Sequence, residues 1–201
     1  MIGDPIGQII KWVSGANARW LEFEDKQTIY FANHSSHLDA FVVWSVLPPR
    51  MRLQTRVIGA KDYWEKTWLR RLISQKIYHP VLIERNKGAA CEGAHQSIDE
   101  IIKALDEKNS IVIFPEGTRN VEEGTKPFKS GLYHIAKQRP EVALVPVYLE
   151  NLNRILPKGE IFFVPLIGSV TFGPRMKIEA GEDKKNFLNR AQEALLKLEA
   201  I

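Results

Sequence analysis

Residues 28–47, TIYFANHSSHLDAFVVWSVL, predict a β-strand that runs into a helix through a short polar segment. The strand, Thr28–Ala32, combines β-branched and aromatic residues, which favour strands. Ser36 is a favourable helix N-cap, and Asp39 follows three residues later in a variant of the capping box. Two prolines directly after this stretch end the helix. Because open α/β sheets bind ligands where strands end and helices begin, the polar segment is the first candidate for a functional site.

The length and composition indicate one globular domain. The chain has 201 residues, of which 44% are hydrophobic and 26% charged, a balance that excludes intrinsic disorder. Its longest apolar stretches are strand-sized, well short of the roughly 18–20 residues of a membrane-spanning helix, so we expect no integral membrane protein. The first residues do not match a secretion signal. A single cysteine, Cys91, cannot form an internal disulfide, in agreement with a reducing cytosol.

Strands alternate with helices along the chain. Further strands are predicted at 57–60, 81–83, 110–114, 143–149, 161–164 and 170–172, and further helices at 64–73, 89–107 and 187–199. This alternation predicts a single-domain α/β fold with a mostly parallel or mixed central sheet flanked by helices. Within one domain over 1–201, we expect an amphipathic helical segment at 1–27, a motif-bearing core at about 28–150, and C-terminal strands and a helix at 160–201.

Positive charge is concentrated in one stretch. The chain carries 28 Lys and Arg against 24 Asp and Glu, a formal net charge of +4. Residues 50–76 alone hold eight basic and two acidic residues, a local excess of +6. Such a stretch suits nucleic acid, a phosphorylated substrate or an anionic bilayer. Nucleic acid ranks last, because the stretch lacks the interleaved aromatic and glycine pattern of RNA-binding modules.

His34 and Asp39 are the candidate acid–base pair. The chain has no nucleophile elbow, phosphate loop, dinucleotide fingerprint or zinc-protease motif. A histidine can accept and return a proton near neutral pH, and a carboxylate on its far nitrogen fixes the tautomer. On one straight helix the two residues would lie about 140° apart, but with Ser36 as N-cap the chain can fold back between them. The alternative is a capping aspartate and a turn histidine without chemistry.

A second polar cluster, FPEGTR at residues 114–119, ends the strand predicted at 110–114. The planar guanidinium of Arg119 suits a phosphate monoester, and Gly117 allows a ligand to approach the backbone closely. Together the two clusters predict a base and an anion site in one cleft. The alternative is an ordinary turn with a surface arginine.

The chain carries five short motifs in order: HSSHLD at 34–39, VLIER at 81–85, FPEGTR at 114–119, FKSG at 128–131 and VPV at 145–147. They resemble the H-x-x-x-x-D, middle, F-P-E-G-T-R, F-K-x-G and V-P-V boxes of glycerolipid acyltransferases of the lysophosphatidic acid acyltransferase type. The first and third boxes are highly specific. The resemblance spans roughly residues 31–147.

This resemblance implies an O-acyltransferase of phospholipid biosynthesis. The implied donor is a fatty acyl thioester of CoA or acyl carrier protein, and the acceptor is a lysophospholipid hydroxyl. We expect 1-acyl-sn-glycerol-3-phosphate as acceptor and phosphatidic acid as product. His34, held by Asp39, would be the general base, with no metal and no further cofactor.

The resemblance also implies an acceptor site. Its residues are Lys61, Arg85, Glu116, Gly117, Thr118 and Arg119. The lysine and both arginines would hold the phosphate, whereas the glutamate and glycine would line the pocket. Further candidates are Ser36, Lys126, Lys129 and Pro146. The two additional lysines are either part of the anion site or solvated loop charges.

A lipid acceptor implies contact with a membrane. The N-terminal segment and the stripe at 64–73 place Trp and Leu beside Lys and Arg, as interfacial helices do, although both could instead pack on the sheet. The family often has a longer hydrophobic N-terminal region, whereas this chain begins about thirty residues before the first motif. We therefore expect a cytoplasmic protein, peripheral to the cytoplasmic face of the membrane, or a domain of a longer protein.

Two other functions stay open. The acceptor could be another alcohol, such as a lyso-ornithine lipid or a glycolipid, and a phosphate-free acceptor would not need Arg85 and Arg119 together. The chain could also be a non-catalytic module that binds lipid or acyl carrier protein. Such a module would not need an intact pair of His34 and Asp39.

Overall fold

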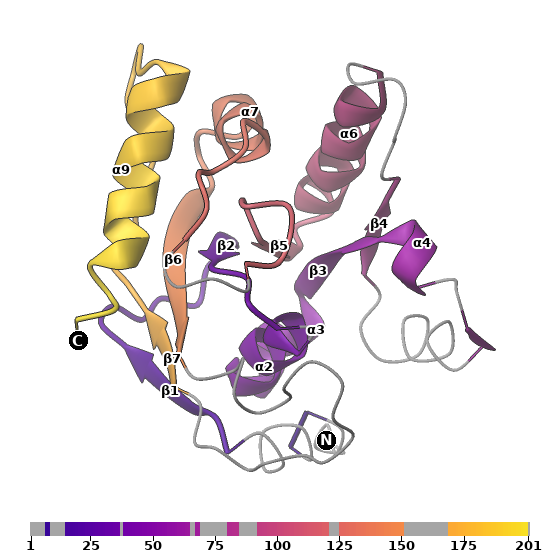
Figure 1. Cartoon of the computed structure of the whole chain (residues 1–201), viewed down its shortest axis with the longest axis vertical. Helices are drawn as coiled ribbons and strands as arrows, with labels where there is room; N and C mark the ends of the chain where they lie inside the picture. Colours follow the sequence, from indigo (N-terminus) through magenta and orange to yellow (C-terminus); the bar gives the residue numbers. More distant parts are fainter. Residues whose placement is uncertain are drawn as a thin grey trace.

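A seven-stranded sheet forms the centre of the computed structural model (Figure 1). The structure describes residues 7–8, 15–36, 38–64, 67–68, 80–84, 92–120, 125–150 and 169–200. The strands are β1 (Asn17–Trp20), β2 (Thr28–Ala32), β3 (Thr55–Ala60), β4 (Val81–Ile83), β5 (Ser110–Ile113), β6 (Ala143–Glu150) and β7 (Ser169–Phe172). The helices are α2 (Asp39–Val46), α3 (Pro49–Leu53), α4 (Lys61–Trp64), α6 (Glu92–Asp106), α7 (Gly131–Gln138) and α9 (Lys184–Leu196).

The strand order is β1-β7-β6-β2-β5-β3-β4. The five strands from β6 to β4 run parallel, β7 is antiparallel to β6, and β1 is parallel to β7. This confirms the predicted α/β fold with a mostly parallel, mixed sheet. The five parallel strands share one edge where all of them end, which we call the carboxyl edge.

The sheet is covered on both faces, and β2 at its centre is buried throughout. Because side chains alternate along a strand, Ile29 and Phe31 pack toward α6, α7 and α9, whereas Tyr30 and Ala32 pack toward α2. Figure 1 shows these two helical layers on opposite sides of the sheet. Burial of a large apolar side chain contributes roughly 1.5–3 kcal/mol, so this double-sided core holds the central strands rigidly.

Most predicted elements are confirmed, with ends shifted by a few residues. The helix predicted at 89–107 is α6, and the helix predicted at 187–199 is α9, which starts three residues earlier behind its N-cap Asp183. The short helices α3 and α7 are additional to the predicted set. The strand predicted at 161–164 lies outside the described residues.

The expectation of a helical segment over residues 1–27 is wrong for its later part, because residues 17–20 form the edge strand β1. This strand pairs with β7 in register, Trp20 opposite Phe172. The rings of these two residues stack with their centroids 3.8 Å apart. Residues 17–20 therefore pair and stack at the edge of the sheet and do not continue the predicted helical segment. Residues 1–6 and 9–14 lie outside the described part of the chain.

The two tryptophans of the apolar stripe predicted at 64–73 lie in different environments. Trp64, at the end of α4, is 6% exposed and packs edge-on against Phe41. A Cβ on Gly59 would overlap this indole, so only glycine allows the close approach. Trp68 is 77% exposed. The interfacial interpretation is therefore wrong for Trp64, which belongs to the core, and the rest of the stripe lies outside the described residues. No helix in the described ranges is long and apolar enough to cross a membrane.

Candidate active site

The turn between β2 and α2 joins His34 to Asp39. The Asp39 side chain is fully buried, and its Oδ2 lies 2.8 Å from Nδ1 of His34. The same oxygen accepts hydrogen bonds from the backbone N–H groups of Ser35 and Ser36, at 2.7 and 2.8 Å. The contact between the two side chains is the one that their spacing predicts. Asp39 also sits in the first turn of α2, where the helix dipole favours a negative charge.

Ser36 does not cap α2 as expected. The N-cap is Leu38, which makes no side-chain capping bond. The Ser36 hydroxyl instead accepts from the Leu38 N–H at 3.2 Å, inside the turn that precedes the helix. The reason is that the Asp39 carboxylate itself takes the N–H groups of Ser35 and Ser36, which closes the turn before the helix begins.

The imidazole of His34 is held on two sides. A carboxylate only accepts hydrogen bonds, so the Nδ1 that faces Asp39 carries a hydrogen, and in the neutral imidazole Nε2 is then the acceptor. The Phe114 ring stacks on the imidazole with centroids 4.3 Å apart and planes 24° from parallel. The His34 side chain remains 19% exposed. Its orientation is thus fixed while a small opening to solvent remains.

The register of β2 and β5 brings the second polar cluster to this turn. Phe31 pairs with Ile113, so the two strands end side by side at the carboxyl edge. The turn at 114–120 therefore begins next to the segment that carries His34. In this respect the structure unites the two clusters as the sequence predicts.

Two hydrogen bonds lock the backbone of His34 to this second turn, and a third joins the turn to Lys126. The His34 N–H donates to Oε1 of Glu116 at 3.0 Å. Its carbonyl accepts from the N–H of Asn120 at 2.6 Å. The other carboxylate oxygen of Glu116, Oε2, accepts from the backbone N–H of Lys126 at 3.1 Å. Glu116 is only 2% exposed, so both of its oxygens face peptide groups in the interior.

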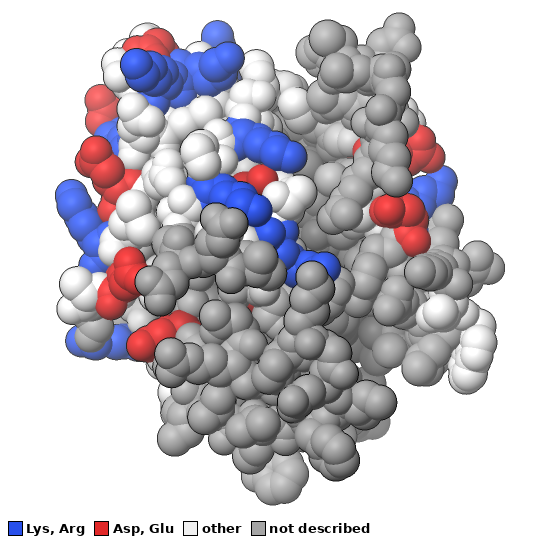
Figure 2. All heavy atoms as spheres, viewed as in Figure 1, with Lys and Arg blue, Asp and Glu red and all other residues white. Residues whose placement is uncertain are grey.

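Arg119 lies in this turn, and Lys126 and Lys129 lie in the segment that leads to α7; we call these three residues the cationic loop. Gly117 has φ 69°, a left-handed conformation that favours glycine, and a Cβ there would lie 2.6 Å from the Lys129 Nζ. The Lys126 Nζ donates to the Arg119 carbonyl at 3.2 Å. Thr118 and Arg119 are exposed. Figure 2 shows Lys and Arg atoms gathered across the middle of the described surface, over the segment that joins β5 to α7.

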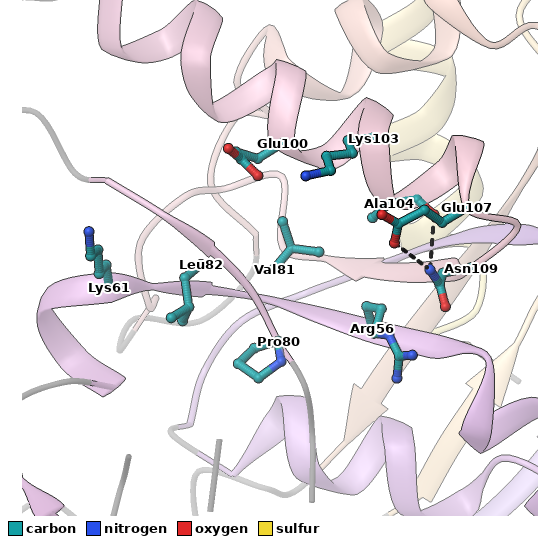
Figure 3. A pocket seen from close by; sticks show the side chains of 10 residues that line it. All are labelled: Arg56, Lys61, Pro80, Val81, Leu82, Glu100, Lys103, Ala104, Glu107 and Asn109. Carbon is teal, nitrogen blue, oxygen red and sulfur yellow. Dashed lines mark hydrogen bonds between the residues drawn. The ribbon is translucent and has the colours of Figure 1, made fainter. Parts of the chain in front are cut away.

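Lys61 lines a pocket to which the cationic loop does not contribute. Its Nζ is 3.3 Å from Oε1 of Glu84, and it lines a pocket of about 470 Å³ between α6 and the strands β3 and β4 (Figure 3). Arg56 and Lys103 contribute further cations to this pocket, but neither His34 nor any residue of the cationic loop lines it. The described contacts of Lys61 are therefore with Glu84 and this pocket, and its role as a phosphate ligand stays a prediction.

The remaining predicted site residues are Arg85 and Pro146. Arg85 lies outside the described residues. The resemblance predicts Pro146 as a candidate for the acceptor site, but the structure places it inside β6, opposite Phe31 and against Gly173. It is buried between two strands, so it supports the sheet and does not line the site.

The sequence interpretation misses two contributors. Phe114 belongs to the FPEGTR motif, which predicts no role for it, yet its ring stacks on the imidazole. The Asn33 side chain bonds both the N–H and the carbonyl of Leu149, at 2.8 and 2.9 Å, and so ties the turn to β6. A polar amide directly after a fully buried strand is a signal that could have indicated such a bond. Within the described residues, no group of three or more His, Cys, Asp or Glu could hold a metal ion.

The fold and the site define an α/β domain with a histidine–carboxylate pair beside a cationic turn at the carboxyl edge. The sequence model of the Acyltransferase family matches residues 17–150, which include both turns. The chain therefore belongs to this family.

Similar proteins carry a consistent name. A 1-acyl-sn-glycerol-3-phosphate acyltransferase from Limnanthes douglasii is 31% identical over 177 residues, which cover 87% of this chain and 59% of the relative. One from Cocos nucifera is 29% identical over 92% of this chain and 58% of its own length. The chain thus spans less than two thirds of these relatives. The crystal structure of the 1-acyl-sn-glycerophosphate (LPA) acyltransferase PlsC from Thermotoga maritima shares the fold, with a TM-score of 0.72 and 17% identity over 98% of this chain and 76% of that one.

We expect Asp39→Asn to destabilise the protein by about 1–3 kcal/mol. The amide can turn one oxygen toward the three donors, but its NH₂ group must then occupy the place of Oδ1, which is buried and has no hydrogen-bond partner among the described residues. Urea unfolding measures the loss. Asp183→Asn is the matched control, because Asp183 accepts the N–H groups of Lys185 and Asn186 at an exposed N-cap, where asparagine is equally suitable. Equal stability of both variants with the wild type would contradict the expectation.

Proposed function

We propose that this protein is an O-acyltransferase that acylates a hydroxyl of 1-acyl-sn-glycerol-3-phosphate to give phosphatidic acid. The donor is a thioester of CoA or acyl carrier protein. The observation that carries the proposal is the 2.8 Å contact of His34 with a buried carboxylate, Asp39, next to a cationic loop. Family membership and the names of the relatives support the same reaction.

The histidine acts as a general base and then as a general acid. Nε2 of His34 takes the proton of the acceptor hydroxyl while that oxygen attacks the thioester carbonyl carbon. Asp39 keeps the hydrogen on Nδ1 and stabilises the imidazolium that forms. When the carbon–sulfur bond breaks, the imidazolium returns the proton to the leaving thiolate. The products are an ester and a free thiol, and no covalent enzyme intermediate is required.

The cationic loop is the acceptor's phosphate site in this proposal. A phosphate monoester carries up to two negative charges, which suits several Lys and Arg side chains on one loop. Arg119 and Lys129 are exposed; Arg119 lies on the turn that also holds the backbone of His34, and the Lys129 side chain lies against Gly117 of that turn. Arg85 and Lys61 remain predicted phosphate ligands from the family resemblance.

A lipid acceptor requires access to a membrane surface, and we propose peripheral binding at the cytoplasmic face. Trp68 is 77% exposed and follows α4, which begins where β3 ends at the carboxyl edge. An exposed indole near cationic residues is the interfacial pattern of peripheral proteins. The membrane contact is therefore assigned to the same edge as the proposed chemistry.

His34→Ala is expected to lower the rate of acyl transfer about 10²–10⁴-fold, the usual contribution of a general base. The assay follows thiol release from acyl-CoA with lysophosphatidic acid as acceptor. His134→Ala, which removes an exposed histidine from α7, is the control and should keep the wild-type rate. A folded His34→Ala protein with more than about a tenth of the wild-type turnover would sink the base assignment.

Arg119→Ala and Lys129→Ala are each expected to raise the KM for lysophosphatidic acid about tenfold or more, since each removes a charged partner of the phosphate. The KM for the acyl donor should not change. Lys184→Ala, an exposed lysine on α9, is the control. If only the donor's KM rises, these side chains belong to the donor site and the assignment fails.

Trp68→Ala is expected to weaken binding to anionic vesicles without lowering the melting temperature, because an exposed indole contributes to the interface and not to the core. Vesicle co-sedimentation at low and high salt measures the effect. Leu53→Ala, 70% exposed and two residues before β3, thus at the opposite edge of the sheet, should bind as the wild type does. Trp64→Ala should instead lower the free energy of unfolding by about 3–5 kcal/mol. Equal binding of Trp68→Ala and the wild type would refute the contact.

A further inference from the structure

Glu116 has a role that differs from the acceptor contact expected from its motif. Its side chain is 2% exposed, and each carboxylate oxygen accepts a backbone N–H. One of these N–H groups belongs to His34 and the other to Lys126. A carboxylate whose two oxygens face peptide groups in the interior is badly placed to bind a glycerol hydroxyl.

The two N–H donors belong to the two parts of the proposed site. His34 precedes Glu116 by 82 residues and lies in the turn after β2, whereas Lys126 belongs to the cationic loop. The His34 peptide is also held from its carbonyl by Asn120. Asp39 and Phe114 orient the imidazole ring, but the bonds to Glu116 and Asn120 are what set the backbone from which that ring projects.

We propose that Glu116 is a positioning residue for the base. Its buried carboxylate fixes the peptide of His34 and the segment at Lys126 relative to each other, and it does not bind the acceptor. This inference rests on the proposed function, in which His34 accepts the proton. In this proposal Glu116 affects the turnover number kcat, whereas the cationic loop determines the affinity for the acceptor.

A carboxylate suits this task because it offers two acceptors and no donor. In Glu116→Gln one oxygen is replaced by an NH₂ group, so one of the two backbone donors meets another donor in the interior. That donor and the amide must move apart, which displaces either the His34 peptide or the Lys126 segment. Glu116→Asp keeps two acceptors on a shorter stem and should disturb the site less.

The test compares Glu116→Gln, Glu116→Asp and the wild-type protein in the acyl-CoA assay, with backbone amide exchange as a second readout. For Glu116→Gln we expect kcat to fall about 10–100-fold, because a small displacement of a catalytic group lowers the rate by a factor of this order. The KM for lysophosphatidic acid should stay unchanged, and the amides at residues 34–36 should exchange faster. Glu116→Asp should retain more of the turnover.

Glu182→Gln is the matched control. This carboxylate is also buried, with its side chain 7% exposed, and it accepts the N–H of Glu179 and the guanidinium of Arg190. It should lose stability and keep kcat. Should Glu116→Gln instead raise the acceptor KM with kcat retained, or leave both kcat and exchange unchanged, the inference is overturned. Failure of the proposed function is a different result, in which His34→Ala retains turnover while the exchange data still report whether Glu116 holds the His34 peptide.

Discussion

The parallel register of β2 and β5 is the constraint on which the candidate site depends. Phe31 pairs with Ile113, and both side chains belong to the core formed with α6, α7 and α9. A slip of one residue would turn these side chains to the other face of the sheet, so burial specifies the register strongly. The same register makes both strands end together. His34 and the turn that starts at Phe114 therefore meet through backbone geometry alone, before any polar side chain contributes.

Two buried carboxylates then hold the turns at these strand ends in a defined arrangement. Asp39 acts locally: one oxygen gathers the ring N–H of His34 and two peptide N–H groups of its own turn. Glu116 acts over 82 residues and joins separate turns. Removing a carboxylate from water is costly, and only charge-assisted hydrogen bonds offset that cost. Each carboxylate is therefore stable in the interior only while its donors stay in place, which makes the turns rigid.

The sequence predicts those parts of the molecule that local patterns determine. Alternation and buried runs locate β2, β5 and β6, and the five-residue spacing correctly pairs His34 with Asp39. What it does not reveal is decided by distant partners. Strand β1 is four residues long and exists through pairing with β7 and the stacking of Trp20 on Phe172, neither of which is visible locally. The burial of Trp64 needs the open space above Gly59, and the donors to Glu116 come from two different turns.

Base and cations differ in how firmly the fold holds them. His34 is fixed by Asp39, Glu116, Asn120 and Phe114, largely out of water, whereas Arg119 and Lys129 are long, exposed side chains. Salt at 0.1 M largely screens the attraction between exposed charges that are more than about 10 Å apart, whereas buried hydrogen bonds are screened far less. In the proposed reaction, ionic strength therefore acts on the capture of the phosphate and leaves the orientation of the base intact. Because Glu116 accepts hydrogen bonds from the His34 peptide and from Lys126, it connects the firmly held base with the loop that carries the exposed cations.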